Sequence, residues 1–269
     1  MIENPSLFNN STVINWALDD RLQKICDEAV RIVDSASKSE VNARLIGGVG
    51  VRLHTRKYAE LFERLGRSPG DIDLVSRKNH SDQIGNIMKS FGYSPAERFN
   101  TYHGHKRQLW YAKTHQIDII FDVLEMNHRV DFRDRLKLDF PTVTPADLLL
   151  TKLQVVNLNK KDIQDMVILL LEHDAVLDER ADTIDLSYLG KVLCSEWGFW
   201  YTANRNLCRI EEFVLNASEL TTAEKDTVNE RTRRITLYLD SIPKSLSFRM
   251  REAIGTRKQW YNDVEEVVR

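Results

Sequence analysis

The amino-acid sequence predicts a mixed α/β (α+β) fold, in which a small mixed sheet is followed by an all-helical C-terminal part. In the first half of the chain, short apolar runs that end at glycine or flank aspartate alternate with segments of helical periodicity. After Pro145, almost every segment shows the apolar spacing of a helix. We therefore expect a sheet domain over residues 1–144 and a helical domain over residues 145–269. The segment from Pro141 to Pro145 is the expected junction.

Apolar spacing and chain-breaking residues predict the individual elements. Ser11 is a candidate N-cap for the first helix, Gly47 ends the first strand, and Ser-Pro-Gly before Asp71 interrupts any regular element. In the first half we expect helices over 11–36, 49–65 and 80–91, and strands over 43–46, 71–75, 108–111 and 116–122. The last two strands should pair through a turn near Thr114. In the second half we expect helices over 146–157, 161–172, 186–194, 197–215, 223–238 and 247–264.

The bulk composition is that of a soluble globular protein. Of 269 residues, 42% are hydrophobic and 29% are charged, and no apolar run approaches the roughly 20 residues that span a bilayer. The net charge of −2 excludes a broadly basic nucleic-acid coat but leaves room for a local basic patch. The three cysteines are scattered and the N-terminus lacks a signal-peptide pattern, so a reduced, cytoplasmic location with no membrane partner is expected.

Three carboxylates lie in apolar strands. Asp71 and Asp73 are two residues apart, so their side chains should point to the same face of a strand, and Asp118 can join them from a neighbouring strand. Clustered carboxylates repel one another unless a cation lies between them, and Mg²⁺ or Mn²⁺ prefers such oxygen ligands. Asp122 is a second candidate for this face. The alternative is an exposed sheet face with solvated carboxylates.

The Gly47-Gly48 pair follows a predicted strand and precedes a predicted helix. Glycine lets backbone N–H groups approach a phosphate closely, and a helix N-terminus attracts anions. Taken alone, the pair would be read as a simple strand-to-helix turn. Beside the carboxylates, a phosphate-contacting turn is the better interpretation, and we expect Arg52 in the following helix to contact the same nucleotide.

Lys152 lies in an otherwise apolar helical segment, and Asp162 and Asp165 open the next predicted helix. A lysine in this setting either extends its ammonium group to solvent at the helix edge or binds phosphate. The two acids either complement the helix dipole or join Lys152 in one site, if the helices fold back on each other.

Two further patterns carry weaker signals. His103 and His105, with His128 further along the chain, do not form a clear zinc site, because no third ligand lies at a suitable spacing. A polar strand near the mouth of a site is the preferred interpretation. The basic and aromatic stretch from Lys244 to Tyr261 predicts a solvated helix with one packed aromatic face. The alternative for this stretch is a surface that holds an RNA backbone.

Gly47-Gly48, Asp71-Ile72-Asp73 and Asp118 resemble the signature of the DNA polymerase β-like nucleotidyltransferase superfamily. Residues 146–167 look like the Lys…Asp-x-x-Asp motif of AbiEii-like (type IV toxin) nucleotidyltransferases, in which the lysine and the first acid are needed for activity. The resemblance covers roughly residues 40–172. The chain departs from the family pattern in two places. The family often has a serine or threonine at or just after the second glycine, and this chain has none there. The stretch from Gly48 to Asp71 is also longer than usual.

The resemblance implies transfer of a nucleoside monophosphate from a nucleoside triphosphate to an acceptor hydroxyl, with release of pyrophosphate. Two Mg²⁺ (or Mn²⁺) ions would serve as cofactors, and tRNA or another RNA would be the acceptor in a toxin–antitoxin or phage-defence setting with an antitoxin as partner protein. The alternatives are a small antibiotic or protein acceptor, a non-catalytic nucleotide-binding module, and an unrelated metal-dependent hydrolase. The resemblance assigns metal binding to Asp71, Asp73 and Asp118. It assigns catalysis to these three acids together with Lys152 and Asp162. It assigns nucleotide contacts to Gly47, Gly48, Arg52, Lys152 and Asp165.

Overall fold

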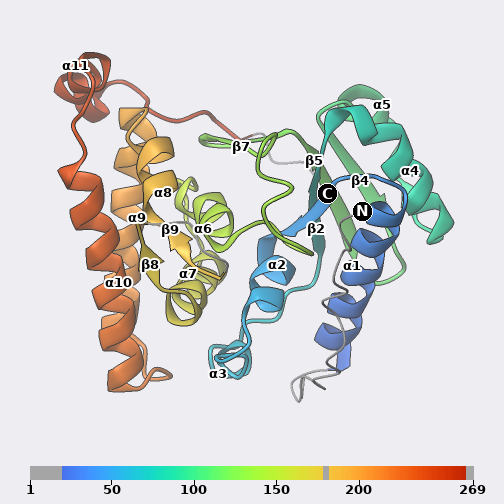
Figure 1. The fold of residues 1–269 in the computed structure, drawn as a ribbon, viewed down its shortest axis with the longest axis horizontal. Coiled ribbons are helices and arrows are strands. Elements are labelled where there is room, and N and C mark those ends of the chain that lie inside the picture. Colours follow the sequence, from blue (N-terminus) through green and yellow to red (C-terminus); the bar gives the residue numbers. More distant parts are fainter. Residues whose placement is uncertain (1–19, 178–181, 265–269) are drawn as a thin grey trace, which may run out of the picture.

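The computed structural model describes residues 20–177 and 182–264. Within these residues the fold is mixed α/β, with eleven α-helices and a mixed sheet of five strands in the order β1-β2-β5-β4-β3 (Figure 1). Strands β2 and β5 pair in parallel, and the other neighbours pair antiparallel. The elements up to the end of the sheet are α1 (Asp20–Lys38), β1 (Ala43–Ile46), α2 (Gly47–His54), α3 (Leu61–Arg64), β2 (Ile72–Ser76), α4 (Ser81–Ser90), β3 (Ser94–Pro95), α5 (Glu97–His103), β4 (Arg107–Tyr111) and β5 (Gln116–Phe121).

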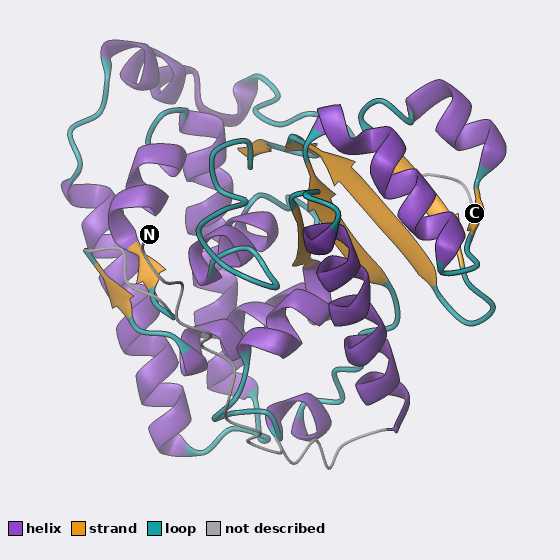
Figure 2. Ribbon diagram, turned by 45° about the vertical axis from the view of Figure 1, so that its right-hand side comes forward, coloured by secondary structure: helices purple, strands orange, loops and turns teal. Residues whose placement is uncertain are grey.

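The remaining elements are mostly helical. Figure 2 shows helices filling the half of the molecule opposite the sheet, apart from two short strands. No helix of the described residues combines the length and the apolar character needed to cross a membrane. The elements after the sheet are β6 (Val123–Glu125), β7 (Arg129–Asp131), α6 (Pro145–Leu153), α7 (Lys160–Glu172), β8 (Ala175–Val176), β9 (Ile184–Asp185), α8 (Leu186–Leu193), α9 (Trp197–Asn216), α10 (Thr222–Ser241) and α11 (Leu246–Ile254).

The central strands bury both faces, and side-chain alternation assigns each residue to one of two cores. Ile72 and Leu74 of β2 pack with α1 and α4, whereas Val75 packs with α2 and the helical half. Likewise Ile117 and Ile119 of β5 face α1 and α4. The residues between them, Asp73 and Asp118 included, therefore point toward the helical half.

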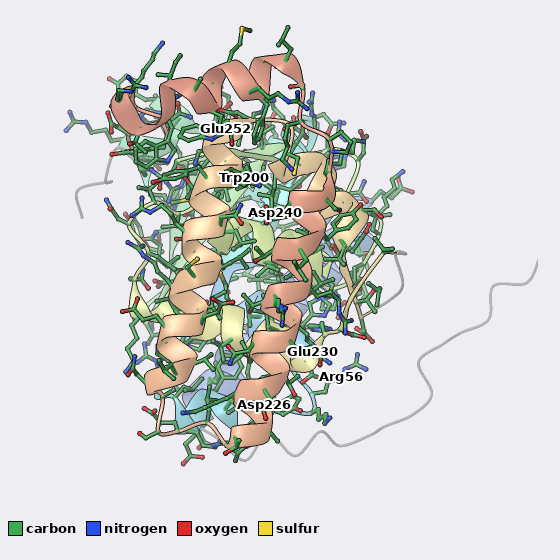
Figure 3. The ribbon with its side chains drawn as sticks, turned by 90° about the vertical axis from the view of Figure 1, so that its left-hand side faces the viewer. Arg56, Trp200, Asp226, Glu230, Asp240 and Glu252 are labelled. Carbon is green, nitrogen blue, oxygen red and sulfur yellow. The ribbon has the colours of Figure 1, made fainter. Side chains whose placement is uncertain are left out.

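The larger core is continuous between the sheet and the helices. It joins residues of β2, β5 and α2 to residues of α6 to α10. Every residue of α7 from Gln164 to Leu171 is buried. Helices α9 and α10 lie side by side over this core, with α11 across one end of the pair (Figure 3). The predicted division at residue 144 stays a prediction, because the larger core extends across it.

Three predicted helices are shorter than expected, and one of them, predicted over 146–157, ends at Leu153. The helix predicted over 49–65 breaks after α2, because the backbone N–H groups of Lys57 and Tyr58 each donate to the Glu172 carboxylate at 3.0 Å instead of continuing a helix. The helix predicted over 247–264 ends at Ile254, because Gly255 has a φ of +60°. The first helix is observed from residue 20, and its predicted N-cap Ser11 lies outside the described residues.

The short elements between and after the main strands were not predicted. They are β3, α5, β6, β7, β8 and β9, none longer than seven residues. Helix α5 has no buried residue, and the strand pairs β6–β7 and β8–β9 are only three and two residues long, so apolar periodicity gives no signal for them.

The chain after α11 returns along α9 toward the sheet. The Trp260 indole N–H donates to Thr202 Oγ1 at 3.0 Å, and its ring packs against Tyr201. Gly198 makes this possible, because a Cβ there would overlap the Trp260 carbonyl oxygen. Asn262 then exchanges hydrogen bonds with Asn127 between β6 and β7, with its backbone N–H donating at 3.0 Å and its carbonyl accepting at 2.9 Å.

Candidate nucleotide-binding cleft

A cleft of about 1300 Å³ opens between the sheet and the start of the helical half. Its walls come from the carboxyl end of β1, the middle of β2 and β5, the segment from α5 to β4, the β6 strand, and helices α6 and α7. Of the residues that the sequence singled out for catalysis or nucleotide contact, five line it: Gly47, Asp73, Asp118, Lys152 and Asp162.

Asp73 and Asp118 lie side by side at the base of the cleft. They are direct register partners in the parallel β2–β5 pair, so their backbones are separated by the usual strand spacing of about 4.8 Å. Removal from water raises the pKa of Asp73 to about 7, and the negative charge of Asp118 acts in the same direction, whereas Lys152 opposes it. Burial is therefore the main cause of the raised pKa of Asp73, and the neighbouring carboxylate adds to it against the charges of Lys152 and Arg107.

Arg107 on β4 holds Asp118 in place. Its Nε donates to Asp118 Oδ1 at 2.8 Å and its Nη2 donates to Oδ2, a bidentate pair that raises the pKa of the guanidinium. Sequence reasoning did not assign Arg107 to the site. Counting the hairpin register back from Asp118, which pairs with Leu109, would have placed Arg107 two residues further along the same face.

Asp71 lies just before β2 and is exposed. Its carboxylate accepts a hydrogen bond from the backbone N–H of Gln116 at 3.2 Å. Its negative charge still contributes to the raised pKa of Asp73, so it lies close to the pair. Asp71 is not among the lining residues of the cleft.

The two glycines make room for charged side chains. Gly47 opens α2 with a φ of +66°, and a Cβ there would overlap the Asp73 carboxylate. A Cβ on Gly48 would overlap the guanidinium of Arg67. The residue before α2, Ile46, makes no side-chain cap hydrogen bond to the first turn, which begins at the cleft.

Gly47→Ala should destabilise the protein by about 2 kcal/mol or more, because it adds backbone strain at positive φ and a clash with Asp73. Chemical unfolding measures this cost. Gly66→Ala is the matched control: Gly66 has nearly the same φ of +64° but no atom within 4 Å of an added Cβ, so only the strain of about 1 kcal/mol applies. Equal losses in the two variants would contradict the close approach to Asp73.

Lys152, at the end of α6, bridges two acids of α7. Its Nζ lies 2.9 Å from Asp162 Oδ1 and 2.9 Å from Asp165 Oδ2. Burial disfavours the ammonium charge, but these two ion pairs outweigh it and raise the pKa of Lys152. The interpretation in which the helices fold back and bring Lys152 to Asp162 is therefore confirmed by the distance. Lys152 and Asp162 line the cleft, whereas Asp165 lies behind them.

Asp165 is fully buried and pairs with a second cation. Arg67 donates to it through Nε at 2.7 Å and through Nη2 at 2.9 Å. Burial alone would raise the pKa of Asp165, but Lys152 and Arg67 hold it below its ordinary value. The predicted contact of Asp165 with a nucleotide stays a prediction. In the structure its carboxylate lies between Lys152 and Arg67 and pairs with both.

The structure does not bring Arg52 to the cleft. It is 2% exposed, donates to the Thr55 carbonyl at 3.0 Å and packs over the Phe62 ring. Among the predicted histidines, His103 and His105 line the cleft, but the polar strand predicted for them is wrong, because His103 ends helix α5 and His105 lies in the turn that follows. His128 is buried elsewhere, stacked on Phe199.

No protein-family model matches the chain, and no curated protein matches it either.

Proposed function

We propose that this protein is a metal-dependent nucleotidyltransferase that moves a nucleoside monophosphate from a nucleoside triphosphate to an acceptor hydroxyl. One observation carries the proposal. Two carboxylates, Asp73 and Asp118, are in register on adjacent parallel strands, directly beside the backbone of Gly47, and Lys152 lines the same cleft. This arrangement offers oxygen ligands for cations and backbone N–H groups for phosphate in one place.

Each residue has a role in the proposed reaction. Asp73 and Asp118, with Asp71 close by, are the residues that would hold Mg²⁺ or Mn²⁺, which neutralises phosphate charge and lowers the pKa of a bound hydroxyl. Asp118 positions the acceptor hydroxyl, and Arg107 fixes the orientation of Asp118. Lys152 lies where it can balance the charge of departing pyrophosphate.

The size and charge of the cleft favour an RNA acceptor. Pockets for small molecules commonly measure about 300–1000 Å³, and this cleft of about 1300 Å³ exceeds that range. Lys78, Lys106, His103 and His105 line the cleft and suit a second polyanion beside the triphosphate, which would compete with Glu125 for Lys106. A tRNA or another RNA, a cytoplasmic location and an antitoxin as protein partner belong to this proposal.

The test is incubation of the purified protein with each α-³²P-labelled nucleoside triphosphate, Mg²⁺ or Mn²⁺, and total cellular RNA, followed by denaturing electrophoresis. We expect label in an RNA band with the wild type and none with the double variant Asp73→Asn/Asp118→Asn. Label in the protein would identify a protein acceptor, and label released as monophosphate would identify a hydrolase. No label, with nucleotide still bound by calorimetry, would indicate a small-molecule acceptor or a non-catalytic module.

Mg²⁺ binding should displace the proton of Asp73. Because burial and the neighbouring carboxylate raise the pKa of this group to about 7, we expect release of a fraction of a proton per protein at pH 7. Mg²⁺ affinity should fall as pH decreases below 7 and change little above it. In the metal-free protein, the raised pKa means that this group's contribution to stability declines as pH rises from about 4 to 7. Calorimetry in buffers of different ionisation enthalpy counts the proton, and Asp73→Asn should release none.

A further inference from the structure

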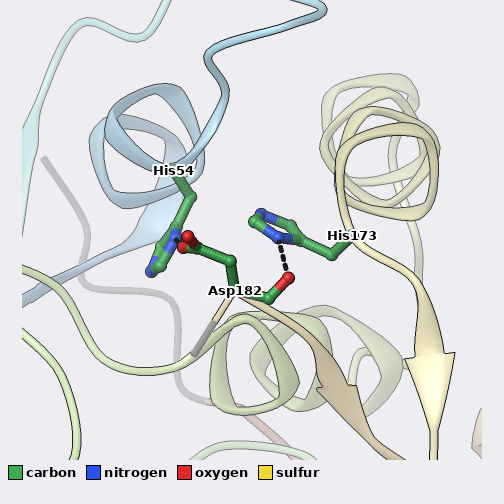
Figure 4. Close-up of side chains that lie close together, drawn as sticks. All are labelled: His54, His173 and Asp182. Atoms are coloured by element: carbon green, nitrogen blue, oxygen red, sulfur yellow. Dashed lines mark hydrogen bonds and ion pairs between the residues drawn. The ribbon is translucent and has the colours of Figure 1, made fainter. Parts of the chain in front are cut away.

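A second cluster of metal-ligating side chains lies outside the cleft, where three segments of the chain meet. His54 is the last residue of α2, His173 follows the end of α7, and Asp182 precedes β9 (Figure 4). One nitrogen of each imidazole and one oxygen of the carboxylate all lie within 4.8 Å of one another. None of the three residues lines the cleft.

The hydrogen bonds of His54 leave one ring nitrogen facing this cluster. Its Nε2 lies 2.6 Å from the Thr142 hydroxyl oxygen, 3.0 Å from the Val143 carbonyl oxygen and 3.3 Å from Asp139 Oδ2. The carbonyl and the carboxylate can only accept, and the hydroxyl can also accept, so we place the proton on Nε2. The lone pair of Nδ1 is left on the other side of the ring, 3.9 Å from Asp182 Oδ1.

His173 is oriented in the same way by another backbone carbonyl. Its Nδ1 donates to the Asp182 carbonyl oxygen at 2.8 Å, so its Nε2 presents a lone pair. This Nε2 has no hydrogen-bond partner in the described residues. Little water can reach it, because the residue is only 2% exposed. Burial lowers the pKa of His173 to about 4, which keeps the ring neutral at physiological pH. A buried acceptor without a donor is costly, and a cation would satisfy it.

Asp182 closes the cluster from the solvent side. Its side chain is 62% exposed, so an ion can enter from this side, and its backbone has a φ of +63°. Within residues 20–177 and 182–264, the Asp182 carboxylate has an ion-pair contact only with the His54 imidazole. The cluster thus brings together a carboxylate oxygen of Asp182, the Nδ1 of His54 and the imidazole of His173, whose Nε2 has no partner among the described residues.

We propose that His54, His173 and Asp182 form a binding site for a divalent transition metal ion, with Zn²⁺ as the best fit. Ligands of tetrahedral Zn²⁺ lie at about 2.0–2.1 Å from the metal, and hence about 3.4 Å from one another. The pair of His54 Nδ1 and Asp182 Oδ1, 3.9 Å apart, would approach by about 0.5 Å, and any pair at the 4.8 Å limit of the cluster by about 1.4 Å. Mixed nitrogen and oxygen donors suit Zn²⁺ better than Mg²⁺. In each imidazole, the ring nitrogen that would not bind the metal contacts a carbonyl or carboxylate oxygen. Metal-bound histidines usually have such a hydrogen-bond partner.

The ion would join the sheet region to the helical region. His54 belongs to α2 beside the sheet, and the partners of its Nε2 lie in the segment before α6, whereas His173 and Asp182 belong to the helical half. A bound ion therefore crosslinks α2 to His173 and Asp182, which are far from His54 in the sequence but close to each other. This role is independent of nucleotide transfer.

The test uses the full-length protein, stripped with a chelator and titrated with Zn²⁺ in competition with a chromogenic chelator. Excess Mg²⁺ is present to occupy the carboxylates of the cleft. Co²⁺ is the second probe, because its visible absorption reports tetrahedral nitrogen and oxygen coordination. We expect one Zn²⁺ per chain, a tetrahedral Co²⁺ spectrum and a higher Tm with Zn²⁺.

Asp182→Asn and His173→Gln should each weaken Zn²⁺ binding by at least about tenfold and abolish the Co²⁺ spectrum. Asp182 is exposed, so its variant keeps the test informative even if His173→Gln does not fold. His128→Gln is the matched control, because His128 is also buried but lies outside the cluster, and it should bind Zn²⁺ as the wild type does. Absence of Zn²⁺ binding by the wild type, or unchanged binding by both cluster variants, would overturn the proposal.

Discussion

Asp118→Asn should reduce nucleotide transfer by about a thousandfold or more while nucleotide binding stays within a few-fold of wild type. The substitution removes one negative ligand from the pair of Asp73 and Asp118 and leaves the side-chain shape unchanged. Metal-based stabilisation of developing charge contributes several kcal/mol to a transition state, and about 4 kcal/mol corresponds to a thousandfold in rate. Initial rates of label transfer, with nucleotide affinity measured separately by calorimetry, test this expectation.

Asp122→Asn is the matched control for this prediction. Asp122 follows directly after β5 but has a φ of +60° and pairs with Arg77 at 2.9 Å, outside the lining of the cleft. Asparagine tolerates positive φ, so the control should fold and retain near wild-type transfer. Transfer by Asp118→Asn at the rate of this control would refute the assignment of Asp118 to the reaction.

Asp165→Asn should lower the free energy of unfolding by about 3–5 kcal/mol at pH 7. Asp165 is fully buried between Arg67 and Lys152, and loss of its charge leaves two cations beside each other in the interior. Urea unfolding provides the measurement. Glu230→Gln breaks an exposed pair with Arg234 and should cost less than about 0.5 kcal/mol.

The penalty of Asp165→Asn should shrink in acid. The folded-state pKa of Asp165 lies below its ordinary value, so its contribution is fully present above the unfolded-state value of about 3.9 and is lost as pH falls through the folded-state value. Unfolding curves for wild type and variant should therefore converge below about pH 4. A constant difference at all pH values would show that the charge of Asp165 is not what stabilises the fold.

Local patterns in the sequence were sufficient for the acid pair and for the contact of Lys152 with Asp162. The alternation of a strand puts Asp73 and Asp118 on one face, and a tight connection between two helices brings the lysine to the acid. These signals extend over only a few residues. The same reasoning gave the pairing of β4 with β5 from apolar runs and a turn, whereas the parallel pairing of β2 with β5 was not predicted.

Contacts between distant segments could not be predicted in this way. Arg67 and Asp165 belong to a loop and a helix that only the tertiary fold brings together, and composition does not indicate which arginine will pair with which acid. Arg52 was expected at the nucleotide because it follows the glycine pair, but helix geometry turns its side chain into the core against Phe62. His54 and His173 have no local motif at all, since their proximity depends on α2 packing beside α7.

The return of the chain along α9 gives the protein a built-in optical reporter. Two of its five tryptophans, Trp197 and Trp260, lie in a group of stacked and edge-on rings with Tyr201 and Tyr261. Asp263, close after this group, lines the cleft. Any ligand that displaces this segment changes the polarity around an indole ring, so intrinsic fluorescence can follow occupancy of the cleft in real time without a dye or a label.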